Sequence, residues 1–292
     1  MKFLVPVDFT DITNPLIRLV KTLAQPHEAE ITLLHTISPV LYLPYPESFG
    51  MSPLDLQILV ELQEKKKEEA REKLRGLMEF LKPLKADILV EVGEPAEVIL
   101  EKEASYDLLF LGSHKKGLVE RILVGSTTEK VVKYSRKPIM VLKGKEPQSI
   151  QKVLFAYDFS EHARKAMDFA VRLLRPFKPY IFILHVEETI EIPVVEGIRD
   201  VLSEKYKEEK LKNLKELEGM LRAEGFQVEA YMVEDKSPTE GIKKFIQENP
   251  SLDLMVLGSR GLSGLKRVLL GSTSSELLRL VEIPMLIHRE EV

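Results

Sequence analysis

A glycine-rich stretch near the end of the chain carries the residues best suited to chemistry. It reads Gly258, Gly261 and Gly264, then the basic and apolar "LKRVLL", then "GSTSSE" at 271–276. Glycines that follow a strand let the backbone approach a ligand closely and take positive φ. Hydroxyls and amides at the start of the next helix can bind phosphate. The stretch therefore predicts a phosphate-binding loop, although it matches neither the Walker pattern nor the G-x-G-x-x-G dinucleotide fingerprint.

Other candidate catalytic or metal-binding groups are few. The chain has no Cys, which excludes disulfides, thiolate nucleophiles and Cys-based zinc sites. Its 6 histidines form no H-E-x-x-H or comparable ligand spacing, so no metal site is expected. His35 and His185 fall at strand ends, where a structural, hydrogen-bonded histidine is expected rather than a catalytic one. No G-x-S-x-G elbow supports a hydrolase triad, so we expect no catalytic residues.

The composition is typical of an ordinary soluble protein. Of 292 residues, 44% are apolar and 30% are charged, and the formal net charge is −4, so nucleic acid is not an expected partner. The N-terminal "MKFLVPVDFT" breaks its apolar run at Asp8, too early for a signal peptide, and no run of 18 apolar residues occurs. These features predict a cytoplasmic protein that does not bind a membrane.

The elements that position the glycine-rich stretch occur twice. "MKFLVPVDFT" at 1–10 matches "QKVLFAYDFS" at 151–160, and "ITLLHTI" at 31–37 matches "IFILHVE" at 181–187. A third match joins 106–142 to 252–288. The polar segment 143–152 lies between the copies and is the expected linker. We therefore predict two domains of one fold, at 1–145 and 150–292.

Within each copy, strand-length apolar runs alternate with segments of helical period, which predicts α/β units around a parallel sheet. In the second copy the expected strands are 152–157, 180–186, 227–233, 253–258 and 284–288. A helix is expected at 160–175 with Ser160 as its N-cap, and charged amphipathic surface helices are expected at 61–82 and 203–224. Pro95 and Pro238 are expected to start helices.

The pattern G-x(2)-G-x(9)-G-[ST], present as Gly258, Gly261, Gly271 and Ser272, resembles the nucleotide-binding signature of the universal stress protein family. The resemblance covers both halves, since an Asp ends the first strand and "LLH" or "ILH" lies in the second. It implies two tandem copies of a five-stranded parallel-sheet, three-layer α/β/α nucleotide-binding fold, similar to the adenine nucleotide α-hydrolase-like fold.

The resemblance also implies a binding site in the second half. Asp158 would accept a hydrogen bond from the adenine or ribose region, and Ala156, Tyr157 and Val186 would line the base pocket. The remaining residues implied for the ribose and phosphates are Leu257, Gly258, Arg260, Gly261, Gly271, Ser272, Thr273 and Ser274. For Asp158, an alternative is a carboxylate that only caps the following helix. For Gly261, it is a plain turn glycine.

The first half departs from the pattern, because Lys115 stands at the position of Gly261 and Leu118 at that of Gly264. A non-Gly residue at positive φ costs on the order of 1–3 kcal/mol, so nucleotide binding there is expected to be weaker. Alternatively, Lys115 and Lys116 add positive charge beside the phosphates. The residues of this weaker site are Val7, Asp8, Gly112, His114, Gly125, Ser126 and Thr127.

The expected function is that of a stress-response regulatory protein that binds ATP or AMP, chiefly in its second half, with Mg²⁺ possible alongside ATP. One alternative is a slow ATPase or nucleotidyl-transfer enzyme, and another is a dimerising scaffold that needs no nucleotide. The resemblance further implies that the last strands, 138–142 and 284–288, pair within one chain as a pseudo-dimer. A homodimer of two chains and a regulatory protein partner are also possible.

Overall fold

The structure is a computed structural model and describes residues 1–39, 52–113, 125–144, 146–189, 196–259 and 270–288. The first half contains the elements β1 (Lys2–Pro6), α1 (Thr13–Ala24), η1 (Gln25–His27), β2 (Glu30–Ile37), α2 (Pro53–Leu81), β3 (Ala86–Val92), α3 (Pro95–Lys102), η3 (Glu103–Ser105), β4 (Leu108–Ser113), α4 (Ser126–Tyr134) and β5 (Ile139–Lys143). Strands and helices alternate, as the apolar pattern predicts.

The second half repeats this order. Its elements are β6 (Lys152–Ala156), α5 (Glu161–Leu174), β7 (Tyr180–Glu188), α6 (Glu196–Ala223), β8 (Gln227–Asp235), α7 (Pro238–Glu248), β9 (Leu254–Gly258), α8 (Ser272–Leu280) and β10 (Met285–His288). Ser160 caps α5 as expected, because its hydroxyl accepts a bond from Ala163 N. Pro95 and Pro238 are the first residues of α3 and α7.

The two long surface helices begin earlier than their charged segments suggest. Helix α2 starts at Pro53 rather than near 61, because Ser52 and Asp55 form a capping box around its first turn. Helix α6 starts at Glu196 rather than near 203. Their first turns lack the dense Lys and Glu pattern on which the sequence prediction rests, so the prediction placed both helix starts too late.

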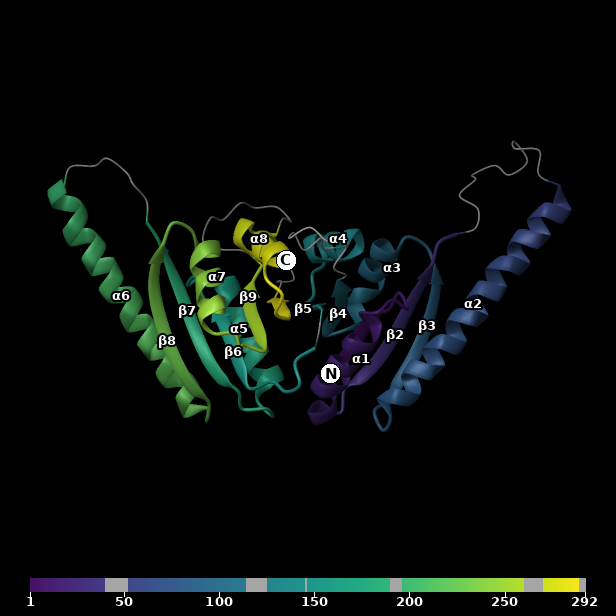
Figure 1. Cartoon of the computed structure of the whole chain (residues 1–292), viewed down its shortest axis with the longest axis horizontal. Coiled ribbons are helices and arrows are strands. Elements are labelled where there is room, and N and C mark those ends of the chain that lie inside the picture. The colour runs from purple at the N-terminus through teal and green to yellow at the C-terminus, as the bar shows by residue number, and fades with distance from the viewer. Residues whose placement is uncertain (40–51, 114–124, 145, 190–195, 260–269, 289–292) are drawn as a thin grey trace.

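All ten strands form one continuous sheet, in the order β3-β2-β1-β4-β5-β10-β9-β6-β7-β8. Among the described residues, neighbouring strands are parallel within each half, and the one antiparallel pair is β5 with β10. Figure 1 shows the halves side by side, with α2 and α6 at opposite ends. The expected pairing of the two last strands within one chain is therefore confirmed.

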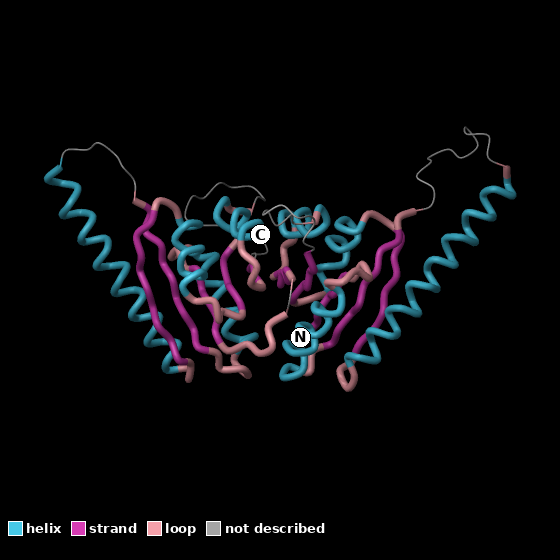
Figure 2. Tube along the Cα trace, viewed as in Figure 1, coloured by secondary structure: helices cyan, strands magenta, loops and turns pink. Residues whose placement is uncertain are grey.

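Helices cover both faces of the sheet, giving the three-layer α/β/α arrangement that was predicted (Figure 2). One face packs against α1, α2, α5 and α6, with residues such as Leu16, Leu74 and Met167 in its core. The other face packs against α3, α4, α7 and α8, with residues such as Val131 and Ile242. Because helices cover the strands on both sides, the strands read as continuous apolar runs.

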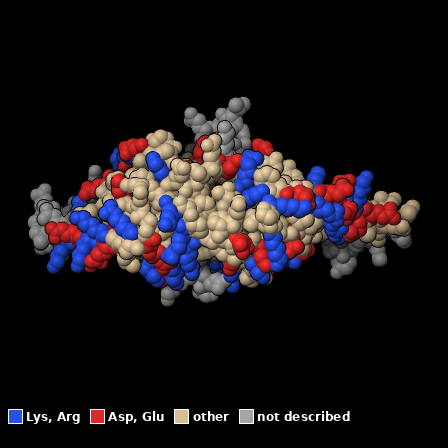
Figure 3. All heavy atoms as spheres, turned by 90° about the horizontal axis from the view of Figure 1, so that it is seen from below, with Lys and Arg blue, Asp and Glu red and all other residues tan. Residues whose placement is uncertain are grey.

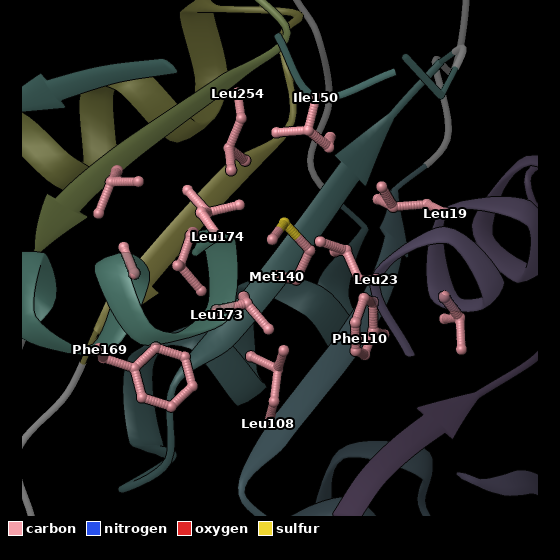
Figure 4. Close-up of a cluster of buried hydrophobic side chains, with 14 of the residues drawn as sticks. Leu19, Leu23, Leu108, Phe110, Met140, Ile150, Phe169, Leu173, Leu174 and Leu254 are labelled. Carbon is pink, nitrogen blue, oxygen red and sulfur yellow. The ribbon is translucent and has the colours of Figure 1, made fainter. Parts of the chain in front are cut away.

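The two halves also share a core at their junction. Figure 4 shows Met140 of β5 between Leu23 of α1 and Leu174 of α5, and all three side chains are fully buried. At the edge of this core, His27 Nε2 lies 2.7 Å from the carbonyl oxygen of Leu173. The halves are thus joined by apolar packing as well as by the strand pair.

The surface carries mixed charge. In Figure 3, Lys and Arg are interspersed with Asp and Glu over the visible face, including the long helices. Pairs such as Glu64–Lys67 and Glu68–Arg71 account for part of this mixture along α2. Within the described ranges, every helix is too short or too polar to span a lipid bilayer.

Candidate nucleotide site

Each half has a cavity at the point where the strand order reverses. In the first half this point lies between β1 and β4, and in the second between β6 and β9. In open parallel sheets ligands bind beyond the carboxyl ends of the strands at such a reversal. The two cavities are similar in size, at about 160 Å³ and about 140 Å³ respectively.

The second-half cavity brings together the site residues expected from sequence that the structure describes. Its lining consists of Ala156, Tyr157, Asp158, Leu184, His185, Val186, Pro238, Ile242, Leu257, Gly258, Gly271, Ser272, Thr273, Ser274 and Leu277. These residues come from the ends of β6, β7 and β9 and from the starts of α7 and α8. Arg260 and Gly261 lie outside the described residues.

The start of α8 forms one side of this cavity. Gly271 is its N-cap and supplies no side-chain cap. The first intrahelical bond runs from Ser275 N to Gly271 O, at 2.9 Å. The amides of the three preceding residues therefore have no intrahelical acceptor and lie at the positive end of the helix dipole. This arrangement suits an anionic group such as phosphate.

Two bonds hold α8 beside the end of β9. Gly271 N donates to Ser259 O at 2.7 Å, and Ser274 Oγ donates to Gly258 O at 2.9 Å. The hydroxyl of Ser274 is thus engaged with the backbone and fixes the helix start. Ser272 and Thr273, which also line the cavity, carry the other hydroxyls expected from sequence.

Close packing, rather than positive φ, explains why a glycine stands at position 258. Gly258 is outside the left-handed region, and a Cβ there would lie 2.8 Å from both Ala163 N and the carbonyl carbon of His162. Gly271 has φ −60° and ψ 153°, an extended conformation open to other residues. The expectation of positive φ at the strand-end glycines is therefore wrong for Gly258.

Positive φ occurs instead in the turn after the first strand of each half. Phe9 has φ 59° and Phe159 has φ 62°, and each follows the Asp that lies two residues after the strand. A non-Gly residue in this region costs on the order of 1–3 kcal/mol and is frequent at binding sites. Asp158 Oδ1 accepts a bond from Ser160 N at 3.0 Å, so this carboxylate also orders the entry to α5.

The base end of the second cavity is apolar and aromatic. Val186 is buried and packs on the start of α7, where a Cβ at Gly241 would lie 2.7 Å from Val186 Cγ1. Tyr157 and Phe159 meet edge to face with ring centroids 5.4 Å apart. Burial raises the pKa of Tyr157 above its ordinary value, so its hydroxyl is neutral at physiological pH.

The first-half cavity has the same position but a different lining. Of the residues expected there, Val7, Asp8, Gly112 and Thr127 line it, whereas Gly125 and Ser126 do not. His114, Lys115, Lys116 and Leu118 lie outside the described residues. The lining also includes Ile12, Leu16 and Ile99, which makes its interior side apolar.

Sequence reasoning missed several residues of the second cavity. Leu184, Pro238, Ile242 and Leu277 contribute apolar surface, although Pro238 was expected only to start a helix. His185 also lines the cavity, and its Nδ1 lies 2.8 Å from the Tyr157 carbonyl oxygen, as expected of a structural histidine. Pro238 starts a helix directly after a strand, so its place at the carboxyl edge of the sheet is the signal for its position.

Metal ligands are not gathered at either cavity. In the ranges that the structure describes, no group of three or more His, Asp or Glu side chains is placed to hold a metal ion. The ionisable side chains lining the second cavity are Tyr157, Asp158 and His185. The positive end of α8 is accordingly the main attraction for an anion among the described residues.

The repeated doubly wound sheet, with a cavity at each reversal of strand order, defines a tandem α/β protein with one candidate ligand site in each half. The model of the universal stress protein family matches the chain twice, at residues 1–143 and 149–289. The chain therefore belongs to the universal stress protein family.

Similar proteins agree with this assignment. A universal stress protein of Mycolicibacterium smegmatis is 24% identical over 98% of this chain and 96% of its own length. One from Synechocystis is 26% identical over 69% of this chain, which spans 64% of that relative. The crystal structure of a universal stress protein from Archaeoglobus fulgidus matches with a TM-score of 0.72 at 22% identity, over 99% of this chain and 98% of that one. At that identity the match shows the fold alone.

Proposed function

We propose that this protein is a stress-response regulator that binds an adenine nucleotide, ATP or AMP, in its second-half cavity. The observation that carries the proposal is the position of the bare N-terminus of α8 beside a partly apolar cavity at a strand-order reversal. The N-terminus of α8 suits the phosphates of a nucleotide, and the apolar part of the cavity suits its base. Their position at one cavity favours a ligand that has both a phosphate and a base.

The phosphates would bind at the start of α8. The amides of Ser272, Thr273 and Ser274 would donate to phosphate oxygens, with Gly271 providing close backbone approach. Residues Arg260 and Gly261, which precede this helix in the chain, are proposed to contact the ribose and phosphates. Mg²⁺ would accompany ATP by binding its phosphates.

The adenine would lie toward β6 and β7. Ala156, Tyr157 and Val186 would contact its ring, and Leu257 would close the slot from β9. Asp158 would accept a hydrogen bond from the base or ribose region. The half-buried carboxylate keeps this capacity beside its bond to Ser160 N, because a carboxylate has about four lone-pair sites.

The proposed role is binding rather than catalysis. Hydrolysis of ATP needs a positioned water and a clamp of charge or metal around the transferred phosphate. The second cavity offers Asp158 as its carboxylate and gathers no carboxylate pair among the described residues. Nucleotide binding is therefore proposed to change the association of the protein with a regulatory partner.

Ligand identification and thermal unfolding test this proposal. Mass spectrometry of small molecules released from the purified full chain should detect an adenine nucleotide at about one per chain. For nucleotide-free protein, ligand at about 100 times its dissociation constant should stabilise the fold by roughly 2.7 kcal/mol. Mg·ATP and AMP should therefore raise the Tm by several degrees, and GTP should raise it less.

Two results would contradict the proposal. If neither Mg·ATP nor AMP changes the Tm of nucleotide-free protein, the second cavity does not bind adenine nucleotides. If phosphate or pyrophosphate is released well beyond one equivalent per chain, the protein is an enzyme rather than a binding regulator. Ser272→Glu serves as the negative control in both assays, because the new carboxylate at the α8 N-terminus repels phosphate and should weaken nucleotide binding.

A further inference from the structure

His185 faces an oxygen acceptor at each ring nitrogen. Its Nδ1 lies 2.8 Å from the Tyr157 carbonyl oxygen, and its Nε2 lies 3.1 Å from Glu187 Oε2. The ring therefore connects the Tyr157 carbonyl, in the turn at the cavity, to the Glu187 carboxylate. The ring is 6% exposed, which leaves water little access to replace either bond.

Glu187 in turn connects His185 to the long helix α6. Its Oε2 accepts a bond of 2.5 Å from Lys210 Nζ. Burial pushes the pKa of Glu187 upward, but the hydrogen bonds from Lys210 and His185 hold it below its ordinary value. A second ion pair, Lys207 to Glu234 at 2.5 Å, joins the same helix to β8 without involving His185.

His185 also holds the strained turn at the cavity. Besides its bond to Tyr157, its ring lies against Phe159, with centroids 4.7 Å apart. Asp158 stands between these two residues and lines the cavity. The two contacts of one buried ring therefore restrain both neighbours of the carboxylate that is proposed to contact the ligand.

The first half has the histidine without the charged connection. His35 Nδ1 lies 2.8 Å from the Val7 carbonyl oxygen, and its ring contacts Phe9 at 4.5 Å. The residue that matches Glu187 is Ile37, which is buried. Within the described part of the chain, His35 therefore has one carbonyl partner and no carboxylate at Nε2.

The helix residue differs in the same way. The buried leucines of the two long helices match at a spacing of 140, as Leu74 with Leu214 and Leu81 with Leu221. At this spacing the residue that matches Lys210 is Ala70, which is buried. The second half thus has an ion pair where the first half has an apolar contact position. Within the described residues, charge joins the histidine to the long helix in the second half and not in the first.

We infer that His185 is a positioning residue for the second cavity, that Glu187 and Lys210 fix the orientation of its ring, and that this chain couples ligand binding to the attachment of α6. The inference rests on the proposed nucleotide binding. The charged groups around His185 are Glu187 on its own strand, Lys210 on α6 and Asp158 in the turn. A ligand that orders the turn strengthens the His185 contacts, and by reciprocity a firmly attached α6 favours the ligand.

A double variant removes the charged connection and leaves His185 in place. Glu187→Ile with Lys210→Ala copies Ile37 and Ala70 of the first half. In the ligand-free full chain, hydrogen exchange of residues 205–214 should be faster in this variant than in the wild-type chain. Equal exchange in the two proteins would overturn the attachment of α6 through Glu187.

Calorimetry with Mg·ATP tests the coupling. The double variant should bind about tenfold more weakly, the effect of losing a hydrogen bond to a charged group. Lys207→Ala, which breaks the neighbouring ion pair, should change the affinity less than twofold. The single variant Lys210→Arg, which keeps a cation beside Glu187, should bind Mg·ATP as tightly as the wild-type chain. Hydrogen exchange of residues 205–214 should slow on Mg·ATP binding in the wild-type chain and not in the double variant.

The outcomes separate this inference from the proposed function. If the wild-type chain binds no Mg·ATP but residues 205–214 exchange faster in the double variant, the proposed ligand is wrong and the charged connection stands. If Mg·ATP binds and the double variant binds equally well, the nucleotide site stands and the coupling through His185 is wrong. Equal weakening by Lys207→Ala would show a general loss of helix attachment and would also overturn the role of His185.

Discussion

The two halves share a fold and a cavity position, but they build the turn at the cavity differently. In the first half, Asp8 Oδ1 accepts bonds from Thr10 N and Thr10 Oγ1, at 3.2 and 2.5 Å, and from Thr13 Oγ1 at 3.4 Å. In the second half, Asp158 Oδ1 accepts one from Ser160 N, and the Ser160 hydroxyl caps α5. The Asp of the first half therefore serves its own turn more heavily than that of the second.

The two halves therefore keep the same sheet and the same strand-order reversal, whereas the side chains that line their cavities differ. The buried Val7 of the first half replaces the half-buried Tyr157 of the second, and Ile12 replaces His162 near the start of the first helix. The cavity survives these changes because the strand ends create it. Ligand preference depends instead on the few side chains that line it.

A charge at the phosphate end should separate the halves most strongly. Ser272→Glu places a carboxylate at the start of α8, where it opposes the phosphates, and should reduce Mg·ATP affinity at least 100-fold. The matched Ser126→Glu at the start of α4 should reduce it less than twofold, because the second cavity holds the nucleotide. Isothermal titration calorimetry of both variants measures the two effects. Equal loss in both variants would mean that the halves bind nucleotide equally.

The free energy of unfolding should depend on pH through Lys143 of β5, which lies at the junction of the two halves. Lys143 is fully buried and donates from Nζ to the Leu278 carbonyl of the second half at 2.5 Å. Burial lowers its pKa to about 8, although Glu282 acts in the opposite direction. Below about pH 8 the ammonium of Lys143 is charged in both the folded and the unfolded chain.

Above that pH, the unfolded chain holds this proton up to its ordinary pKa near 10.4, so stability rises with pH. Between pH 7 and pH 10 the wild-type chain should gain about 2 to 3 kcal/mol relative to Lys143→Met. Urea unfolding of the two proteins at both pH values measures this difference. A difference that does not change with pH would mean that burial does not lower the pKa of Lys143.

Adding a methyl group at the strand-end glycine should cost the second half more than the first. At Gly258 the new Cβ would meet backbone atoms of His162 and Ala163, whereas at Gly112 it would meet Ile12 Cγ2 at 2.7 Å. A side-chain end can move aside more easily than backbone. Gly258→Ala should therefore destabilise by about 2 to 3 kcal/mol and Gly112→Ala by about 1 kcal/mol, as urea unfolding will show. The opposite order would refute this packing account.

The smallest effect should be the same in both halves. Gly76 in α2 and Gly219 in α6 have no atom within 4 Å of an added Cβ. Replacing either by Ala should stabilise the fold by about 0.5 to 1 kcal/mol, because Ala loses less backbone entropy in a helix. Thermal unfolding of the two single variants provides the comparison. Unequal gains would indicate that the long helices differ in stability.

Local patterns in the sequence were sufficient to predict most of the fold. The alternation of apolar strands and amphipathic helices places β6 to β10 within two residues of their observed ends, and Ser160 and Pro238 mark helix starts correctly. The start of α2 was missed, because Pro53 and its capping box precede the charged repeat on which the prediction was based. Capping is a local signal, so this start was available in principle.

The candidate site was only partly predictable. Gly271, Ser272 and Asp158 stand out because their types and strand-end positions suit phosphate or base contacts. The positive φ of Phe159 was not predictable, since aromatic residues rarely adopt it and tertiary contacts with His185 and Tyr157 support it here. The bond from Ser274 Oγ to Gly258 O likewise joins residues 16 apart and follows from the packed fold.

The antiparallel pair β5 and β10 has a further consequence for how the molecule behaves in the cell. Only the segment 144–151 separates β5 from β6, so the two halves meet at an effective concentration on the order of millimolar, whatever the abundance of the protein. Dilution cannot separate them, as it can separate two chains. The last strand of each half is therefore always paired with the last strand of the other half. The cavity residues of one copy can therefore change while the other copy keeps the shared sheet stable.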